Sequence, residues 1–493
     1  MKQTNKQGVS LRRMLGVRET ITITVGTVIG VGLFTVGANV VGIMGSSVIL
    51  ATLAAMAISI YPALLYAEMG SSLPVAGGTY RYAALGLGRP FGMLAGWNFI
   101  ISMVSVASGE ALAFSFYLRI LLEAFGVSLP FDEKFLAVGA VVLFLILGIR
   151  GIETTGRLQN GFMFFFWGVA VVWVLSMLPH LNFENFSGGI LGDRGPSGFL
   201  SCVALVWWCF AGFETCCAMG EEIKYPQINL PRALILAPFL VFAVNGLFQW
   251  VLVCTVPSGS LAALAEAAAP YAEGMQYAGV VGFPLILLCL GIAFGGDFST
   301  LNASVTAPAR YLYTMAGDGV VPKCFGRLHC KYCTPAVSIL ALGLLMIALI
   351  STGSIEYIAS LSLFATLFYY VIGIAAACGL RIKHPNMVRP YRAPAIWLGS
   401  AVSIIIYLVM MTQLEKSAVA AGIIWCTLGV LAYGISRRRK GGGISLEIPE
   451  LPDPPSAEEK QKMDREYRIW RIAVTAAVVI VILLFLAGFL AGR

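Results

Sequence analysis

The chain has 493 residues, of which 58% are hydrophobic and 12% are charged, and its mean hydropathy is +0.84. Soluble domains carry roughly twice that share of charged residues, so this composition excludes a water-soluble fold. The formal net charge of +8 does not indicate nucleic-acid binding, because Lys and Arg gather in the cytoplasmic loops of membrane proteins. The apolar runs are continuous rather than alternating, which is typical of membrane-spanning helices and not of barrel strands. An all-α integral membrane protein is therefore predicted.

The N-terminal residues Met1–Glu19 are polar and basic. They lack the short apolar core and cleavage site of a removable signal peptide, so none is expected. The 11 cysteines mostly stand singly within apolar runs. This pattern is typical of small apolar side chains and not of a disulfide framework.

Thirteen apolar runs are predicted to span the membrane. If the N-terminus is cytoplasmic, 28 of the 33 Lys and Arg residues fall on the cytoplasmic side and five fall outside. The positive-inside rule favours this orientation, and it supports the number of spans because one missed span would invert every later loop. We therefore expect a multi-pass protein of the plasma membrane with a cytoplasmic N-terminus. The predicted spans cover residues 20–44, 47–69, 92–119, 135–150, 158–178, 199–220, 233–256, 278–311, 336–351, 356–380, 396–414, 418–436 and 472–490.

The first span carries three glycines within seven residues, Gly26, Gly30 and Gly32. Glycine destabilises the interior of a helix, and a backbone group freed within the membrane must find a partner in protein, water or ligand. The glycines therefore indicate either a broken helix that binds something or a surface where another helix approaches closely.

The sixth span contains a second interruption, because Trp207–Glu214 combines aromatic residues, a glycine and an acid. It comes five spans after the first, and a repeat of five spans places its second copy inverted in the membrane. Paired interrupted helices in two halves are typical of transporters whose site lies near the middle of the bilayer. The predicted fold is a 5+5 inverted-repeat transporter core with discontinuous helices 1 and 6, 12 core helices and a 13th C-terminal helix.

A composition change marks the end of this core. Three glycines and then four prolines follow the twelfth span and indicate a linker. Ser456–Glu459 has the pattern of a capping box that starts a charged helix leading to the last span. The predicted parts are a cytoplasmic segment (1–19), a transporter core (20–436) with repeats at about 20–178 and 199–380 and helices 11 and 12 at about 396–436, a cytoplasmic linker (437–471) and an extra transmembrane helix (472–490).

Five motif regions occur in order along the chain: Gly30–Phe34, Ala67–Tyr82, Gly212–Arg232, Arg310–Pro335 and Arg389–Pro394. In order and spacing they resemble the motifs of the amino acid–polyamine–organocation (APC) permease family, and the resemblance covers roughly residues 10–435. It implies the LeuT-type fold and a secondary transporter that works by alternating access. A protein of this kind is not an enzyme, and no cofactor is expected.

The two interruptions supply the predicted substrate site. The outer half of the first helix begins near the middle of the membrane, where its free N–H groups and dipole favour an anion. We therefore predict that the N–H groups of residues 30–32 bind a substrate carboxylate and that the carbonyls of Val28, Trp208 and Ala211 bind its ammonium group. The resemblance implies the same contacts. The candidate substrate-binding residues are Val28, Gly30, Val31, Gly32, Trp208, Phe210, Ala211 and Gly212.

Two of these residues leave the substrate open. Val31 stands where many relatives have Ser or Thr, so a hydroxyl contact to a carboxylate is missing and the prediction of a standard α-amino acid is weaker. Trp208 falls where the arginine/agmatine antiporter of the family has a Trp that closes over substrate. A Trp can stack on a cation, but beside Trp207 it is equally a core residue, and Phe210 has the same two interpretations.

Four acids lie in or near predicted spans, where a charge is costly and usually functional. Glu214 matches a family position tied to proton-dependent gating and is the first candidate for proton coupling. Glu110 and Asp297 have no clear family counterpart, and each could bind a proton, bind a cationic substrate group or pair with a buried polar group. Glu68 ends the second span and could simply cap it.

The coupling ion is not indicated directly. Proton-coupled relatives often carry a Lys in the fifth helix, but the fifth span here has none, and Phe166 aligns with that position. Exchange, or proton use through a carboxylate, is therefore favoured. A sodium ion would need oxygens near helices 1 and 8. Ser299, Thr300, Ser304 and Thr306 have hydroxyls there, although such groups more often bond the preceding turn.

Two features outside the spans could bind other partners. The loop Cys324–Cys333 has four potential zinc ligands, but their spacing is compact and irregular and relatives carry this loop without metal, so no metal site is expected. The basic run Arg437–Lys440 either contacts anionic lipid or serves only to fix the topology.

The sequence thus predicts a secondary active transporter that moves an amino acid across the plasma membrane, as an antiporter or a proton-coupled symporter. Its expected partners are the lipid bilayer, a small amino acid or amine, and a proton or exchanged substrate. One alternative is a polyamine or organic amine exchanger, which Val31 and the buried acids favour. Another is a transporter-like amino-acid sensor, against which the short tail without a recognisable domain counts.

Overall fold

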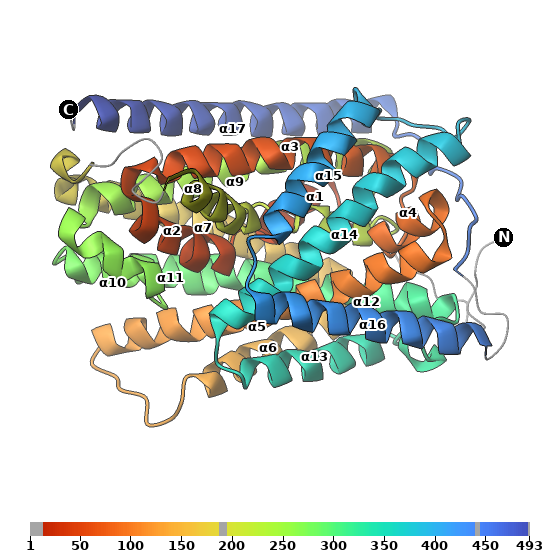
Figure 1. The fold of residues 1–493 in the computed structure, drawn as a ribbon, viewed down its shortest axis with the longest axis horizontal. Helices are drawn as coiled ribbons and strands as arrows, with labels where there is room; N and C mark the ends of the chain where they lie inside the picture. Colours follow the sequence, from red (N-terminus) through yellow and green to blue (C-terminus); the bar gives the residue numbers. More distant parts are fainter. Residues whose placement is uncertain (1–12, 187–194, 439–443, 492–493) are drawn as a thin grey trace.

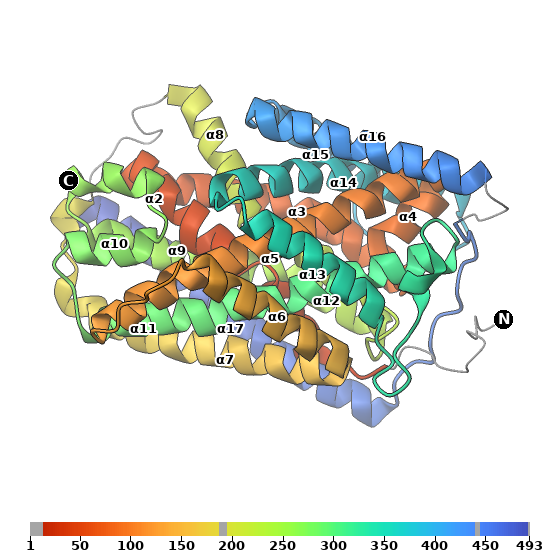
Figure 2. The ribbon, with the colours of Figure 1, turned by 90° about the horizontal axis from the view of Figure 1, so that it is seen from below.

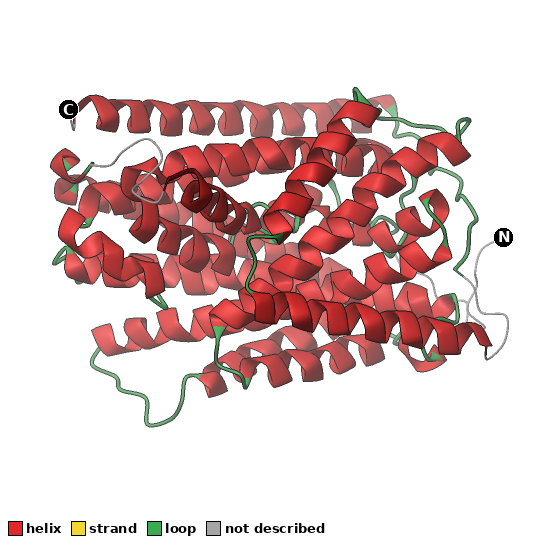
Figure 3. Cartoon of the chain, in the orientation of Figure 1, coloured by secondary structure: helices red, strands yellow, loops and turns green. Residues whose placement is uncertain are grey.

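The protein is described by a computed structural model that covers residues 13–186, 195–438 and 444–491. These residues form helices joined by loops and contain no β-strand (Figure 3). Nine helical segments within them are long and apolar enough to cross a membrane, and two shorter apolar helices, Ala336–Ile350 and Ile396–Met411, accompany them. The prediction of an all-α membrane protein is confirmed, whereas the number of 13 spans and the inverted repeat stay predictions.

A helical segment occurs at each predicted span, with most boundaries differing by a few residues. Two of the segments labelled η, η1 and η7, are π-helical, and the others are 3₁₀ helices. The elements are α1 (Val17–Gly26), η1 (Gly32–Val36), α2 (Gly37–Met44), η2 (Gly45–Ser47), α3 (Val48–Ser72), α4 (Gly78–Gly86), α5 (Arg89–Ala124), α6 (Lys134–Arg150), α7 (Ile152–Met177), η3 (Leu178–His180), η4 (Phe183–Asn185), α8 (Gly195–Trp208), η5 (Phe213–Ala218), α9 (Pro226–Thr255), η6 (Ser258–Glu266), α10 (Pro270–Tyr277), α11 (Phe283–Gly291), η7 (Ile292–Asp297), α12 (Phe298–Gly317), η8 (Lys323–Gly326), α13 (Ala336–Ile350), α14 (Ile355–Lys383), α15 (Ile396–Met411), α16 (Lys416–Arg438) and α17 (Ala457–Ala491).

The long helices form a bundle whose centre is α5, and many of them run along the long axis of the molecule (Figures 1 and 2). α5 packs against α14, α12, α4, α6 and α13. Large apolar side chains remain exposed on the outside, as at Val171, Leu344 and Leu398. Exposed apolar surface of this extent is unfavourable in water and favourable in lipid. The pattern of burial therefore fits a bundle surrounded by a bilayer.

Both predicted interruptions are present. α1 ends at Gly26, the first break comprises residues 27–30, and the helix then resumes through η1 into α2. α8 ends at Trp208, the second break comprises residues 209–212, and η5 follows. Gly212 has a backbone φ of +106°, a conformation that residues other than glycine rarely adopt. This glycine turns the chain from α8 into η5.

Some helices lie where no span was predicted. α4 occupies the connection between the second and third spans, and η6 and α10 occupy the connection after α9. The predicted span 278–311 consists of α11, η7 and α12, so a π-helical segment stands at its middle. These short segments lack a long apolar period, and tertiary packing rather than the local pattern stabilises them.

The C-terminal helix α17 runs along the outside of the bundle beside α9 and extends over nearly its whole length (Figure 1). Its start is the predicted capping box, in which the Glu459 N–H donates to Ser456 Oγ at 3.2 Å. Farther along, Trp250 Nε1 of α9 donates to the carbonyl of Leu484 at 3.1 Å. The helix begins about 15 residues before the predicted span, because its first turns are charged and stand outside the apolar run.

Candidate substrate site

The first and second breaks meet inside the bundle. The thiol of Cys209 donates to the carbonyl of Gly32 at 2.9 Å. A Cβ atom added at Gly32 would lie 3.4 Å from Cys209 Cα, and one added at Gly212 would lie 3.4 Å from the carbonyl oxygen of Thr27. The missing side chains therefore allow two backbones to approach closely at the point where both helices are interrupted.

The predicted substrate-binding residues line this junction or adjoin it. Seven of the eight are buried, namely Val28, Gly30, Val31, Gly32, Trp208, Phe210 and Gly212, and Ala211 is half-buried. The arrangement is therefore closed to solvent at its centre.

The carbonyl and the indole N–H of Trp208 already have protein partners. The carbonyl of Trp208 accepts a hydrogen bond from the Ala211 N–H at 3.1 Å. The indole N–H of Trp208 donates to Ser362 Oγ of α14 at 3.3 Å. In this closed arrangement Trp208 is packed as a core residue against α14.

The backbone N–H predicted to bind a substrate carboxylate binds a carboxylate of the protein. The N–H of Val31 lies 2.9 Å from both Oε1 and Oε2 of Glu110, which projects from α5. Gly30 is required for this approach, because a Cβ atom there would lie 2.3 Å from Glu110 Oε1. The anion site expected at the first break is thus occupied by an internal acid.

Asp297, at the end of η7, is the neighbour of this acid. Its carboxyl group interacts with that of Glu110. Asp297 is fully buried, and among the described residues no N–H or O–H donates to either of its carboxyl oxygens. The sequence treated Glu110 and Asp297 as separate candidates, and the tertiary structure brings them together.

Glu214, the first candidate for proton coupling, has a different environment. The phenol groups of Tyr369 and Tyr370 on α14 each donate to one of its carboxyl oxygens. The Gly212 N–H donates in turn to the Tyr370 hydroxyl at 3.2 Å. Glu214 therefore links the second break to α14, and sequence reasoning missed both tyrosines.

The carbonyls freed at the end of α1 also have partners. Thr300 Oγ1 donates to the carbonyls of Gly26 and Ile29, at 2.7 and 3.0 Å respectively. Ser299 Oγ lies 3.2 Å from the Gly26 carbonyl, and Gln159 Nε2 of α7 lies 2.6 Å from Ser299 Oγ. Hydroxyls from α12 therefore replace the helical hydrogen bonds that the first break removes.

The other residues considered for ion coupling are Ser304, Thr306 and Phe166. Thr306 Oγ1 bonds the carbonyl of Asn302 one turn back, at 3.0 Å, and Ser304 Oγ is buried without a hydrogen-bond partner among the described residues. Phe166 packs against Phe34 with 5.5 Å between ring centroids. Gln159 of α7, and not Phe166, donates to a carbonyl of α1, that of Thr22, at 3.2 Å. In the sequence, the feature that could have indicated this role of Gln159 is its polar amide side chain within the predicted fifth span.

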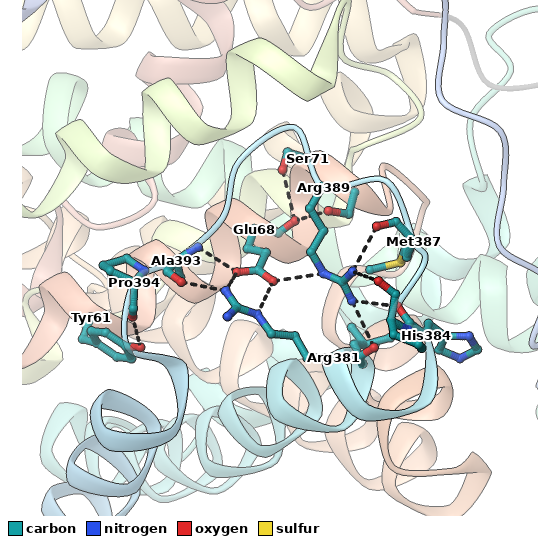
Figure 4. A network of polar contacts seen from close by, with 12 residues as sticks. Tyr61, Glu68, Ser71, Arg381, His384, Met387, Arg389, Ala393 and Pro394 are labelled. Atoms are coloured by element: carbon teal, nitrogen blue, oxygen red, sulfur yellow. Dashed lines mark hydrogen bonds and ion pairs between the residues drawn. The ribbon is translucent and has the colours of Figure 1, made fainter.

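Glu68 is more than a helix cap. It accepts hydrogen bonds from the Arg381 guanidinium at 2.9 and 2.6 Å and from the Ala393 N–H at 2.7 Å, and Arg389 approaches it to 3.2 Å (Figure 4). Two arginines and a backbone N–H thus neutralise the carboxylate. The network joins α3 to α14 and to the loop that follows α14.

A second ion pair links α12 to the loop that follows η5. Arg310 of α12 donates to both carboxylate oxygens of Glu222, at 3.0 and 3.1 Å, and both side chains are 1% exposed. The Glu222 carbonyl accepts the N–H groups of Met14 and Leu15. The segment before α1 and the loop after η5 are therefore both attached to α12.

The Cys324–Cys333 loop contributes no visible cluster of ligands. Within the described ranges, no three His, Cys, Asp or Glu side chains come together as metal ligands would. Cys324 and Cys330 are exposed, and His329 stacks on Tyr332 with 4.9 Å between centroids. Of the basic run Arg437–Lys440, Arg439 and Lys440 lie outside the described residues.

Comparison with known proteins agrees with this architecture. A family model described as amino acid permease matches residues 15–433. An uncharacterized transporter of Mycobacterium tuberculosis is 30% identical over 436 residues, covering 87% of this chain and 92% of the relative. The branched-chain amino acid permease of Bacillus subtilis is 26% identical over 462 residues, covering 87% of this chain and 94% of the relative. The methylthioribose transporter of the same organism is 25% identical over 446 residues, with the same shares covered.

In the described residues, an all-helical bundle with nine segments long and apolar enough to cross a membrane and two interrupted helices defines the class as a helical membrane transporter. The chain belongs to the amino acid permease family of APC transporters. It is therefore an integral membrane transporter and not an enzyme.

Proposed function

We propose that this protein moves an amino acid across the plasma membrane by alternating access, with its N-terminus in the cytoplasm. The observation that carries the proposal is the junction of the first and second breaks, where backbone groups of two interrupted helices face one another in the interior. Such a junction offers both N–H and carbonyl groups, and a zwitterion needs both kinds.

The substrate contacts follow from the chemistry of the two breaks. The N–H groups of Gly30, Val31 and Gly32 receive the carboxylate, and the carbonyls of Val28 and Ala211 receive the ammonium group. Val31, Trp208 and Phe210 surround the substrate side chain with apolar surface. Two relatives are named branched-chain amino acid permeases, so L-leucine is the first substrate to test.

Alternating access requires the cytoplasmic end to open. The segments that contain the breaks, α1 and α8 with η5, move with their neighbours against a scaffold of α5, α6, α12 and α13. The contact that must separate is the ion pair between Glu222, after η5, and Arg310 of α12. Transport is driven by exchange or by a proton bound to a buried carboxylate.

Transport is tested with the purified full-length protein in proteoliposomes. Uptake of labelled L-leucine and of the other standard amino acids is measured with and without internal substrate and with and without a pH gradient. Accumulation or exchange of at least one amino acid is expected. Binding without accumulation or exchange would contradict transport and favour the sensor.

Glu214→Gln tests the gating role of this acid. Because one tyrosine can still donate to the amide oxygen and the hydroxyl of the other can accept from the amide NH2 group, the variant should fold, and the pH dependence of its uptake should change. An unchanged pH profile would remove Glu214 from the coupling step. Glu184→Gln, an exposed Glu of the η4 turn, is the matched control.

A polyamine or amine exchanger is the second candidate. The bond between Glu110 and the Val31 N–H favours it, because an internal acid already occupies the place predicted for a substrate carboxylate. Uptake of labelled putrescine in preference to every amino acid would support this candidate.

A further inference from the structure

Buried charges in the described residues are strongly unbalanced. Six acids are buried but only one base, Arg310. Four of the acids have cationic or phenolic donors: Glu68 and Glu222 pair with arginines, Asp318 accepts from Tyr80 and lies 3.6 Å from Arg81, and Glu214 accepts from two tyrosines. Burying an ionised group without such partners is costly. Glu110 and Asp297 are the two buried acids in the described chain that have no cationic or phenolic donor.

Among the described residues, the interactions of the pair include no charged group other than the two acids themselves. From the first break it is faced by the Val31 N–H, and Asp297 comes from η7. Tyr117 of α5 lies beside Asp297, and its hydroxyl donates to the Phe34 carbonyl. The other titratable side chains around Tyr117 are thiols and a phenol, and they are Cys209 after α8, Cys289 of α11 and Tyr271 of α10.

A shared proton resolves this imbalance. Repulsion between two ionised carboxylates in contact is much stronger in the interior than in water. With one proton the pair carries a single negative charge, and the protonated oxygen of one acid can donate to the other. The remaining charge is then stabilised by the Val31 N–H at the start of the outer helical half.

An incoming substrate carboxylate needs the same N–H group. It cannot share that site with ionised Glu110, because two anions would then compete for one donor in a buried space. Protonated Glu110 is a weak competitor and can turn away from Val31. Resting on the proposed function, we infer that the substrate carboxylate displaces Glu110 from the Val31 N–H and that Glu110 leaves as the protonated acid, so that each amino acid carries one proton.

The charges balance in this exchange of partners. The empty site holds two carboxyl groups and one proton. The loaded site holds both carboxyl groups protonated and a zwitterionic substrate, so loading takes up one proton from the side that supplies the amino acid. Release on the other side restores the bond between Glu110 and Val31 and frees that proton. Amino acid and proton therefore move together, as in a symporter.

The test uses the full-length protein in proteoliposomes that contain a pH-sensitive dye. The probe is an equimolar mixture of the standard L-amino acids, labelled with ¹⁴C, and a parallel sample receives the corresponding decarboxylated amines. The wild-type protein should take up label and acidify the lumen when the amino acids are added. One proton per amino acid allows accumulation of up to about tenfold per unit of pH gradient. The amines should produce neither response.

Glu110→Gln should exchange amino acid across the membrane without acidifying the lumen, and the roughly tenfold accumulation should be lost. Glu184→Gln should behave as the wild type. Uptake of label without proton movement by the wild type, or continued acidification by Glu110→Gln, would overturn the inference while leaving the proposed function intact. Proton-coupled uptake of the amines would also overturn it.

A second measurement is independent of transport. The infrared C=O band of a protonated carboxyl group should be present in the purified wild type near neutral pH. It should be lost in Asp297→Asn, which leaves Glu110 ionised on the Val31 N–H, and shifted in Glu110→Gln, which leaves Asp297 protonated without the carboxylate that accepts its proton. An unchanged band in both variants would overturn the shared proton. If no label is taken up by the wild type, the proposed function fails, and the infrared result still decides the protonation of the pair.

Discussion

Loss of one member of the ion pair between Arg310 and Glu222 should strongly destabilise the fold. Both side chains are 1% exposed, and the two hydrogen bonds are 3.0 and 3.1 Å long. Arg310→Gln leaves the Glu222 carboxylate buried without a cation. Breaking a buried pair in this way costs about 3–5 kcal/mol. Replacing both residues, with Arg310→Met and Glu222→Leu, should cost less than either single change because no charge is stranded.

An exposed pair provides the matched control. Arg119 and Glu133 lie 3.2 Å apart, but their side chains are 45% and 25% exposed. Exposed pairs contribute about 0.2–1 kcal/mol, so Arg119→Gln should have a much smaller effect.

Thermal unfolding in detergent can be followed with a thiol-reactive dye, since seven of the eleven cysteines are buried. The unfolding midpoint should fall clearly for Arg310→Gln and hardly at all for Arg119→Gln. Equal shifts for the two variants, or a double variant less stable than both single variants, would refute the reasoning.

Two further changes test the junction and the tail. Gly30→Ala should lower the unfolding midpoint, because a methyl group there meets Glu110 at 2.3 Å and disrupts a hydrogen bond to a charged group worth about 1.5–3 kcal/mol. The control is Gly109→Ala, whose methyl group lies 3.6 Å from its nearest neighbour and should be tolerated. Equal effects of the two variants would contradict the role of Gly30. Hydrogen bonds from Ser456 and Tyr225 lower the pKa of Glu459 below its ordinary value of 4.5, so this contact stabilises the start of α17 above that pH and is lost as the pH falls through the lowered pKa. The protection of the amides in the first turns of α17 against hydrogen exchange, relative to their intrinsic exchange rate at each pH, should therefore fall on acidification, and Glu459→Gln should abolish that pH dependence.

The sequence predicted the helices well because the membrane imposes a simple rule on them. A span must be apolar over its length and must bond its own backbone. The resulting runs are visible without knowledge of the fold, and a helical segment was found at each. The interruptions at Gly30 and Gly212 were equally visible, since glycine and an acid within an apolar run conflict with that rule.

Partners across the bundle could not be predicted in the same way. Glu110 and Asp297 lie 187 positions apart in the numbering, and no local pattern relates them. The tyrosines that hold Glu214 and the Gln159 amide beside α1 also come from distant helices. Sequence reasoning identified the acids as unusual but assigned each of them alone.

The sequence by itself therefore determined that the chain is a helical membrane protein, where its helices run and where two of them break, because burial in lipid constrains every residue of a span. Only the tertiary structure decided what the freed backbone groups bind. At Val31 the predicted anion site holds the carboxylate of Glu110. Hydrogen bonds and charge pairs act over a few ångströms, so their partners are set by how the helices pack and not by their order along the chain.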